Sequence, residues 1–113
     1  MPSERCATAI AQILQSIERA RDLAAGARES FGLDWRTVYA ATRCLEIISE
    51  ASRRLDEDLK SRHPGIPWRD IADAGNVYRH AYEVVEPGRL WDTIVHALPA
   101  LEAALRQDVG GSG

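Results

Sequence analysis

Apolar residues recur every three or four positions along most of the chain, which is the spacing of one face of an α-helix. A first helix is predicted to begin with Ser3 as its N-cap. A second begins near Asp34 and continues until the proline-containing segment 63–67 stops it. On its charged side Glu50 and Arg54 lie four residues apart, so we expect them to form a weak surface pair.

The same periodicity predicts a third helix over about 68–82 and a fourth over about 87–107, with a kink at Pro99. No segment shows the alternation of a half-buried strand over a useful length. We therefore expect an all-α fold, an antiparallel up-and-down bundle of four helices or possibly five. It forms a single domain over residues 1–108, followed by a flexible tail at 109–113.

Size and charge narrow the possible functions. A chain of 113 residues is the size of one ordinary domain. Its net charge of -3 argues against a general nucleic-acid coat, so any RNA contact must be local. Cys6 and Cys44 fit no metal spacing and are expected to be reduced, packed thiols. Neither a signal peptide nor an apolar run of membrane-spanning length is evident, which predicts a cytoplasmic protein without a membrane partner.

The third predicted helix carries the densest chemistry of the chain. An α-helix turns by roughly 100° per residue, which divides this segment into two faces. The expected core face consists of Ile71, Gly75, Tyr78 and Tyr82. The opposite, polar face consists of Arg69, Asp73, Asn76 and His80. A polar stripe opposite a core is typical of any surface helix. This one places an amide one turn before an imidazole, the group that titrates nearest neutral pH, with Arg79 at the flank.

Other candidate groups have simpler interpretations. His63 and His96 are expected to be structural or incidental, and no paired His/Glu metal motif or glycine-rich phosphate loop is present. Each of the tryptophans stands near a predicted helix start: Trp35, Trp68 and Trp91. We expect them to be packing anchors rather than platforms for stacked bases, because aromatic rings bury a large area.

Several stretches, in this order and spacing, resemble the HEPN superfamily of small helical bundles, and more closely its HepT-like toxin branch. The stretches are 43–51, 63–71, 76–82 and 85–94, and the resemblance covers about residues 7–107. The hallmark of the family is an arginine, usually followed by a polar residue, and then a histidine after four to six intervening residues. HepT-like members add a tyrosine two residues after the histidine.

The hallmark is matched only in part. His80 and Tyr82 match the histidine and tyrosine, and Asn76 matches the polar residue. Gly75 stands where the arginine is expected. Arg79, directly before the histidine, is the nearby candidate to replace it, on chemical grounds alone.

The resemblance implies a metal-independent ribonuclease without a cofactor, acting as the toxin of a toxin–antitoxin pair. It implies a homodimer in which two copies of His80 face one cleft. Asn76 would steady the phosphate, and on chemical grounds we expect Arg79 to do so too. We add Arg69 as a further RNA contact. The implied partner is a minimal nucleotidyltransferase antitoxin, which neutralises the toxin by adding AMP to Tyr82.

Two alternatives remain open at this stage. Gly75 in place of arginine favours a catalytically degenerate HEPN module that binds a nucleotide or the nucleotidyltransferase. A plain helical scaffold is the third possibility. If the third helix continues straight, Tyr82 points toward the core, so either the helix ends by Ala81 or this tyrosine packs rather than accepting AMP.

Overall fold

The structure, a computed structural model, describes residues 3–80 and 86–110. Its elements, in chain order, are α1 (Glu4–Leu23), α2 (Arg28–Phe31), α3 (Trp35–Ser52), α4 (Glu57–Arg62), α5 (Trp68–His80), α6 (Pro87–Asp92), the π-helical turn η1 (Thr93–Ala97) and α7 (Leu98–Gly110). Every element within these residues is helical, which confirms the all-α prediction. No described helix combines the length and apolar character needed to cross a membrane.

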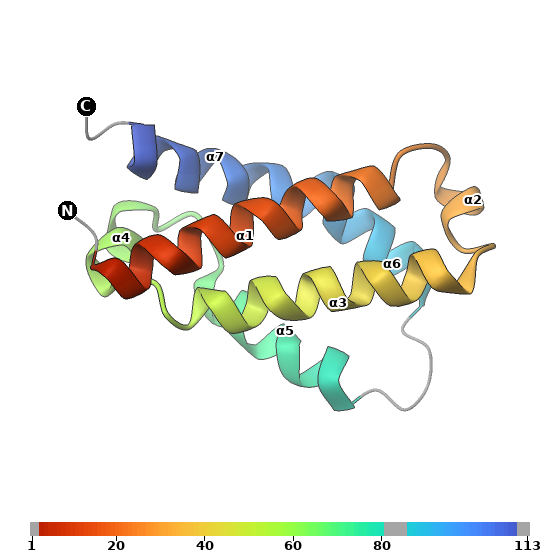
Figure 1. The fold of residues 1–113 in the computed structure, drawn as a ribbon, viewed down its shortest axis with the longest axis horizontal. Coiled ribbons are helices and arrows are strands. Elements are labelled where there is room, and N and C mark those ends of the chain that lie inside the picture. Colours follow the sequence, from red (N-terminus) through yellow and green to blue (C-terminus); the bar gives the residue numbers. More distant parts are fainter. Residues whose placement is uncertain (1–2, 81–85, 111–113) are drawn as a thin grey trace.

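The long helices lie side by side in the order α7, α1, α3, α5 (Figure 1). The most extensive contact joins α1 and α3, which run antiparallel, and α5 packs against α3 on the side away from α1. The core between these helices is aliphatic and is made chiefly by Ile10, Ile13, Ile17, Val38, Leu45, Ile48, Leu90, Ile94, Leu101 and Leu105. α5 therefore lies at the edge of the bundle.

Local signals position the starts of the two longest helices correctly. The hydroxyl of Ser3 accepts a hydrogen bond from the backbone N–H of Cys6 at 3.1 Å, as an N-cap should. The carboxylate of Asp34 accepts one from the backbone N–H of Arg36 at 3.0 Å. Both predicted caps are confirmed.

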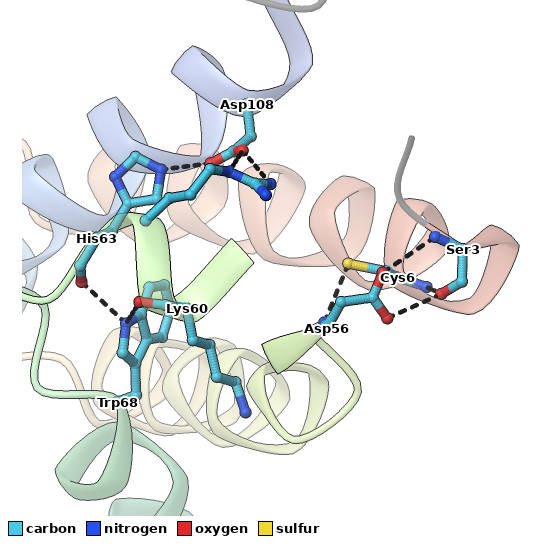
Figure 2. A network of polar contacts seen from close by, with 8 residues as sticks. Ser3, Cys6, Asp56, Lys60, His63, Trp68 and Asp108 are labelled. Atoms are coloured by element: carbon cyan, nitrogen blue, oxygen red, sulfur yellow. Dashed lines mark hydrogen bonds and ion pairs between the residues drawn. The ribbon is translucent and has the colours of Figure 1, made fainter. Parts of the chain in front are cut away.

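The predicted second helix is wrong in its extent, because the chain breaks between α3 and α4. After Ser52 the chain tightens into a run of turns, in which Leu55 N–H donates to the Ser52 carbonyl at 3.3 Å. The carboxylate of Asp56 then accepts hydrogen bonds from the backbone N–H and the hydroxyl of Ser3, each at 3.0 Å (Figure 2). The break docks this turn onto the first residues of α1 while keeping Leu55 and Leu59 buried.

A second polar cluster ties α4 and the following loop to α7. Arg62 and His63 both contact the carboxylate of Asp108, and the indole N–H of Trp68 donates to the backbone carbonyls of Lys60 and His63 at 3.2 and 3.0 Å (Figure 2). Desolvation acts to raise the pKa of Asp108, but the hydrogen bonds and positive charge of its two partners hold that pKa below its usual range. This cluster gives His63 the structural role expected of it.

The predicted fourth helix is interrupted rather than continuous. α6 gives way to the π-helical turn Thr93–Ala97, and α7 begins immediately before Pro99. Proline has no N–H to donate to the preceding turn and its ring crowds the carbonyl there, so the hydrogen-bond pattern changes just ahead of it. The chain thereby passes from α6 to α7 without a loop.

Candidate active site on α5

α5 meets α3 at a point where two small residues face each other. Gly75 is buried, and its N–H donates to the hydroxyl oxygen of Ser49 at 2.8 Å. The same hydroxyl donates to the carbonyl of Ala72 at 2.9 Å. A Cβ on Gly75 would stand 2.5 Å from the Ser49 oxygen and 3.0 Å from its Cβ, and the first distance is so short that Ser49 would have to shift. The close approach of the two helices therefore requires glycine at the position where the family carries arginine.

The division of α5 into two faces agrees with the wheel wherever side chains are described. On the inner face Gly75 is buried, and Ile71 and Tyr78 are half-buried. Burial raises the pKa of the Tyr78 phenol, which keeps it neutral at physiological pH. On the outer face the side chains are exposed: Arg69, Asp73 and Asn76. His80 is the last residue of α5, its side chain lies outside the described part, and so does all of Tyr82.

Arg79 forms an ion pair with Glu50 of α3. Each side chain is 42% exposed, so the pair lies at the surface and remains open to solvent. Glu50 thus pairs across to α5 rather than with Arg54, which instead contacts Gln12 of α1, and the expected Glu50–Arg54 pair is wrong. The helix break after Ser52 explains the error, because Arg54 lies beyond the end of α3.

The guanidinium of Arg79 lies close to Gly75 as well as to Glu50. Its terminal nitrogen lies 3.8 Å from where a Cβ on residue 75 would stand. A second guanidinium reaches the same seam from α3, because Arg53 donates to the carbonyl of Ala72 at 2.8 Å. The seam between α3 and α5 therefore brings together two arginines and the carboxylate of Glu50.

The sequence predicted Asn76, Arg79 and His80 as site residues and gave no indication of the α3 side of this seam. The pattern places Glu50 and Arg53 on the charged side of the second predicted helix and assigns no site role to Ser49. The one local signal was the pair of small residues, Ser49 and Gly75, which is what a close helix approach needs. Matching them required knowing that the two helices are neighbours.

An apolar cavity of about 270 Å³ lies behind α5, between α3, the segment 65–67 and the η1–α7 region. Its lining includes Leu45, Ile71, Tyr78 and Leu101, with the exposed His96 at its side. The cavity borders the inner face of α5, away from Asn76. Among the described residues no three side chains of His, Cys, Asp or Glu gather closely enough to hold a metal ion.

The tryptophan prediction is correct for two residues and wrong for the third. Trp68 is half-buried and bonded as above, and the indole N–H of Trp91 donates to the carbonyl of Ala24 at 3.2 Å. Trp35 is 64% exposed and meets the ring of Tyr39 at 5.5 Å between centroids, rather than packing into the core. It stands at the first position of α3 and is not among the buried residues of that helix.

Comparison with known proteins identifies the family of the chain. The family described as Ribonuclease HepT-like matches residues 13–107, which is most of the chain and includes all of α3 and α5. This chain belongs to the HepT-like ribonuclease family. The resemblance drawn from the sequence is thus confirmed.

Individual relatives agree with the family match. The chain is similar to "Probable ribonuclease HepT" of Thermococcus cleftensis, with 42% identity over 74 residues that cover 66% of this chain and 67% of the relative. It is also similar to "Putative RNase TTE0752" of Caldanaerobacter subterraneus subsp. tengcongensis, with 33% identity over 79 residues and 70% coverage of each chain. No solved structure matches the chain significantly.

Proposed function

We propose that this HepT-like protein is a metal-independent endoribonuclease, the toxin of a toxin–antitoxin pair, with His80, Arg79 and Asn76 as its catalytic residues. The observation that carries the proposal is the placement of Arg79. Its guanidinium reaches the space beside Gly75, where the arginine of the family motif would begin. A cation is therefore available one residue before His80, although the motif's own arginine is absent.

The chemistry needs no group beyond these side chains and the RNA. The 2′-hydroxyl attacks the adjacent phosphorus, its proton goes to a base, and an acid protonates the departing 5′-oxygen, which leaves a 2′,3′-cyclic phosphate. Two copies of His80, one from each subunit of a homodimer, serve as base and acid. Arg79 and Asn76 stabilise the charge that builds on the phosphate oxygens.

The surface pairing of Arg79 is compatible with this role. An ion pair between solvent-exposed side chains contributes about 0–1 kcal/mol, so a phosphate can displace Glu50 at little cost. Arg69 and Asn76 are both exposed on the outer face of α5 and offer further contacts to the strand. Until RNA arrives, Glu50 holds the guanidinium beside the seam.

Ribonuclease assays in EDTA test the proposal. Wild-type protein is expected to degrade RNA, and His80→Ala to lose that activity. Arg79→Ala should lower the rate by about 10²-fold, the effect of removing one charge-stabilising donor. Arg106→Ala is the matched control, because Arg106 is an exposed arginine on α7 that pairs with Glu102. Equal degradation by wild type and His80→Ala would rule the enzyme out, and an unchanged Arg79→Ala would remove Arg79 from the mechanism.

The partners have their own tests. Light scattering is expected to give a dimer at micromolar concentration, and a monomer would contradict the two-histidine cleft. Incubation with the cognate minimal nucleotidyltransferase antitoxin and ATP should add one AMP to Tyr82. Mass spectrometry would detect the added mass in wild type and not in Tyr82→Phe.

Gly75 supports a second candidate, a catalytically degenerate HEPN module that binds a nucleotide or the nucleotidyltransferase without cutting RNA. Restoring the arginine tests it, but Gly75→Arg alone would drive a side chain into Ser49. The informative variant is Gly75→Arg combined with Ser49→Gly, compared with Ser49→Gly alone. Activity that appears only in the double variant favours the degenerate module, whereas activity already present in wild type excludes it.

A further inference from the structure

An exposed aromatic pair stands at the start of α3, away from the seam with α5. Trp35 and Tyr39 are 64% and 61% exposed, and their rings meet edge to face at an interplanar angle of 79°. Leu33, 87% exposed, lies just before them. Exposing rings of this size to water is unfavourable, and neighbouring exposed apolar side chains make this patch a candidate contact surface.

Arginines alternate with these rings at helical spacing. The guanidinium carbon of Arg36 lies 5.7 Å from the centroid of the Trp35 ring, within the range of a cation–π contact. Arg43 follows Tyr39 by one turn on the same side of the helix and is also exposed. Each arginine has an acidic neighbour. The Arg36 Nε lies 3.7 Å from a carboxylate oxygen of Asp34, the N-cap of α3, and Arg43 pairs with Glu46, three residues further along the helix. These are surface pairs, which a phosphate can displace.

We propose that Trp35, Arg36 and Tyr39 form a platform on which unpaired bases of single-stranded RNA stack, while Arg36 and Arg43 contact the phosphates. The inference rests on the proposed ribonuclease function and extends its substrate to single strands. Aromatic rings interleaved with cations are the usual means of holding single-stranded nucleic acid, because every base presents a flat face to stack. A duplex cannot use such a platform, since its bases already stack on one another.

The platform lies on the path of a strand that reaches α5. α5 runs toward the N-terminal half of α3 (Figure 1). From the seam at Ser49, Tyr39 lies ten residues back along α3, about 15 Å, and His80 lies five residues beyond Gly75, about 8 Å in the same sense. The platform and the end of α5 therefore lie in the same direction from the seam, as one RNA strand bound to both would require.

A second copy of the chain is a less suitable occupant. The two rings expose roughly 250 Å² between them, given about 200 Å² for each aromatic side chain. Even with Leu33 this remains well below the about 800 Å² that each partner of a stable complex buries. The patch is large enough for a pair of bases and too small to hold a dimer by itself.

Binding to a strand that cannot be cut separates this inference from the enzyme activity. A labelled 2′-O-methyl oligonucleotide of about ten nucleotides would be titrated with wild type, Trp35→Ala, Tyr39→Ala and Trp35→Phe, followed by fluorescence anisotropy. Each alanine variant is expected to raise Kd about tenfold, and Trp35→Phe by less than about threefold. Leu33→Ala is the matched control, because it removes a neighbouring exposed apolar side chain that cannot stack. The duplex form of the oligonucleotide should bind more weakly than the single strand.

The outcomes are distinct. Unchanged Kd values for Trp35→Ala and Tyr39→Ala overturn the platform. So does an equal loss in Leu33→Ala together with dissociation of a dimer in light scattering, which would assign the patch to protein contact. Thermal melting of each variant checks that it is folded. Cleavage of natural RNA is measured in parallel. Binding that depends on the two rings without cleavage would refute the enzyme and keep the platform. Cleavage together with an unchanged Kd for Trp35→Ala would keep the enzyme and refute the platform.

Discussion

Gly75→Ala tests the seam between α3 and α5, because two effects of opposite sign compete there. On helix propensity alone, alanine is more favourable than glycine in a helix interior by about 1 kcal/mol. Against this, the new Cβ would lie 2.5 Å from the oxygen of Ser49 and 3.0 Å from its Cβ. Ser49 is buried, so it has no solvent to move into.

The contact between the new Cβ and Ser49 costs more free energy than the helix propensity of alanine gains. Displacing the Ser49 hydroxyl strains its bonds to Ala72 and Gly75, each worth about 1 kcal/mol. Overpacking a tight contact costs a further ~1–3 kcal/mol. We therefore expect Gly75→Ala to lower the free energy of unfolding by about 2 kcal/mol. In a domain of this size a loss of 2 kcal/mol lowers Tm by roughly 10 °C.

Urea unfolding followed by circular dichroism measures the change, with Ser49→Ala and the double variant completing a cycle. Ser49→Ala removes the oxygen that the new Cβ would strike, so Gly75→Ala should cost less in that background, with a coupling of about 1–2 kcal/mol. If Gly75→Ala instead stabilises the protein by about 1 kcal/mol and adds to Ser49→Ala without coupling, the two helices do not meet as described.

Three further predictions concern the framework. The pKa of Asp108 is depressed in the folded state, so its stabilising contribution is present above its unfolded pKa of about 3.9 and is lost as the pH falls through the folded value. Asp108→Asn should therefore show a flatter dependence of Tm on pH from about 5 down to about 2, and a dependence as steep as that of wild type would contradict this. Trp68→Phe loses two indole hydrogen bonds and should destabilise by about 1–2 kcal/mol in urea, whereas the exposed Trp35→Phe should change stability by under about 0.5 kcal/mol. Burial raises the pKa of the Cys6 and Cys44 thiols, so neither should react with a thiol reagent until urea unfolds the chain, and rapid labelling of the native protein would show that they are accessible.

Features that depend on neighbouring residues in sequence were predictable, and those that depend on distant ones were not. Ser3 and Asp34 cap their helices with hydrogen bonds to residues two or three positions away, so the local sequence alone indicates both caps. The break after α3 depends on Asp56 accepting two bonds from Ser3, 53 residues earlier, and no local signal announces it. The same limit concealed the ion pair between Glu50 and Arg79.

The candidate site shows the same contrast between features set by nearby residues and features set by distant ones. The helical period correctly separated Asn76 from Gly75 because it requires only the geometry of one helix. It could not show that Ser49 approaches Gly75 so closely that no side chain fits, nor that Trp35 is left uncovered. Both depend on which element packs on which face. The placement of Tyr82 stays a prediction, since that residue lies outside the described part of the chain.

The edge position of α5 has a consequence for how the molecule opens. α1 is held between α3 and α7, whereas α5 makes its main contacts with α3 alone. A helix supported on one side loses fewer contacts when it detaches, so its opening free energy is a fraction of that for global unfolding. Amide hydrogens of α5 should then exchange with solvent before those of α1. The residues proposed to cut RNA thus lie on the helix that a binding partner can reshape without disturbing the core.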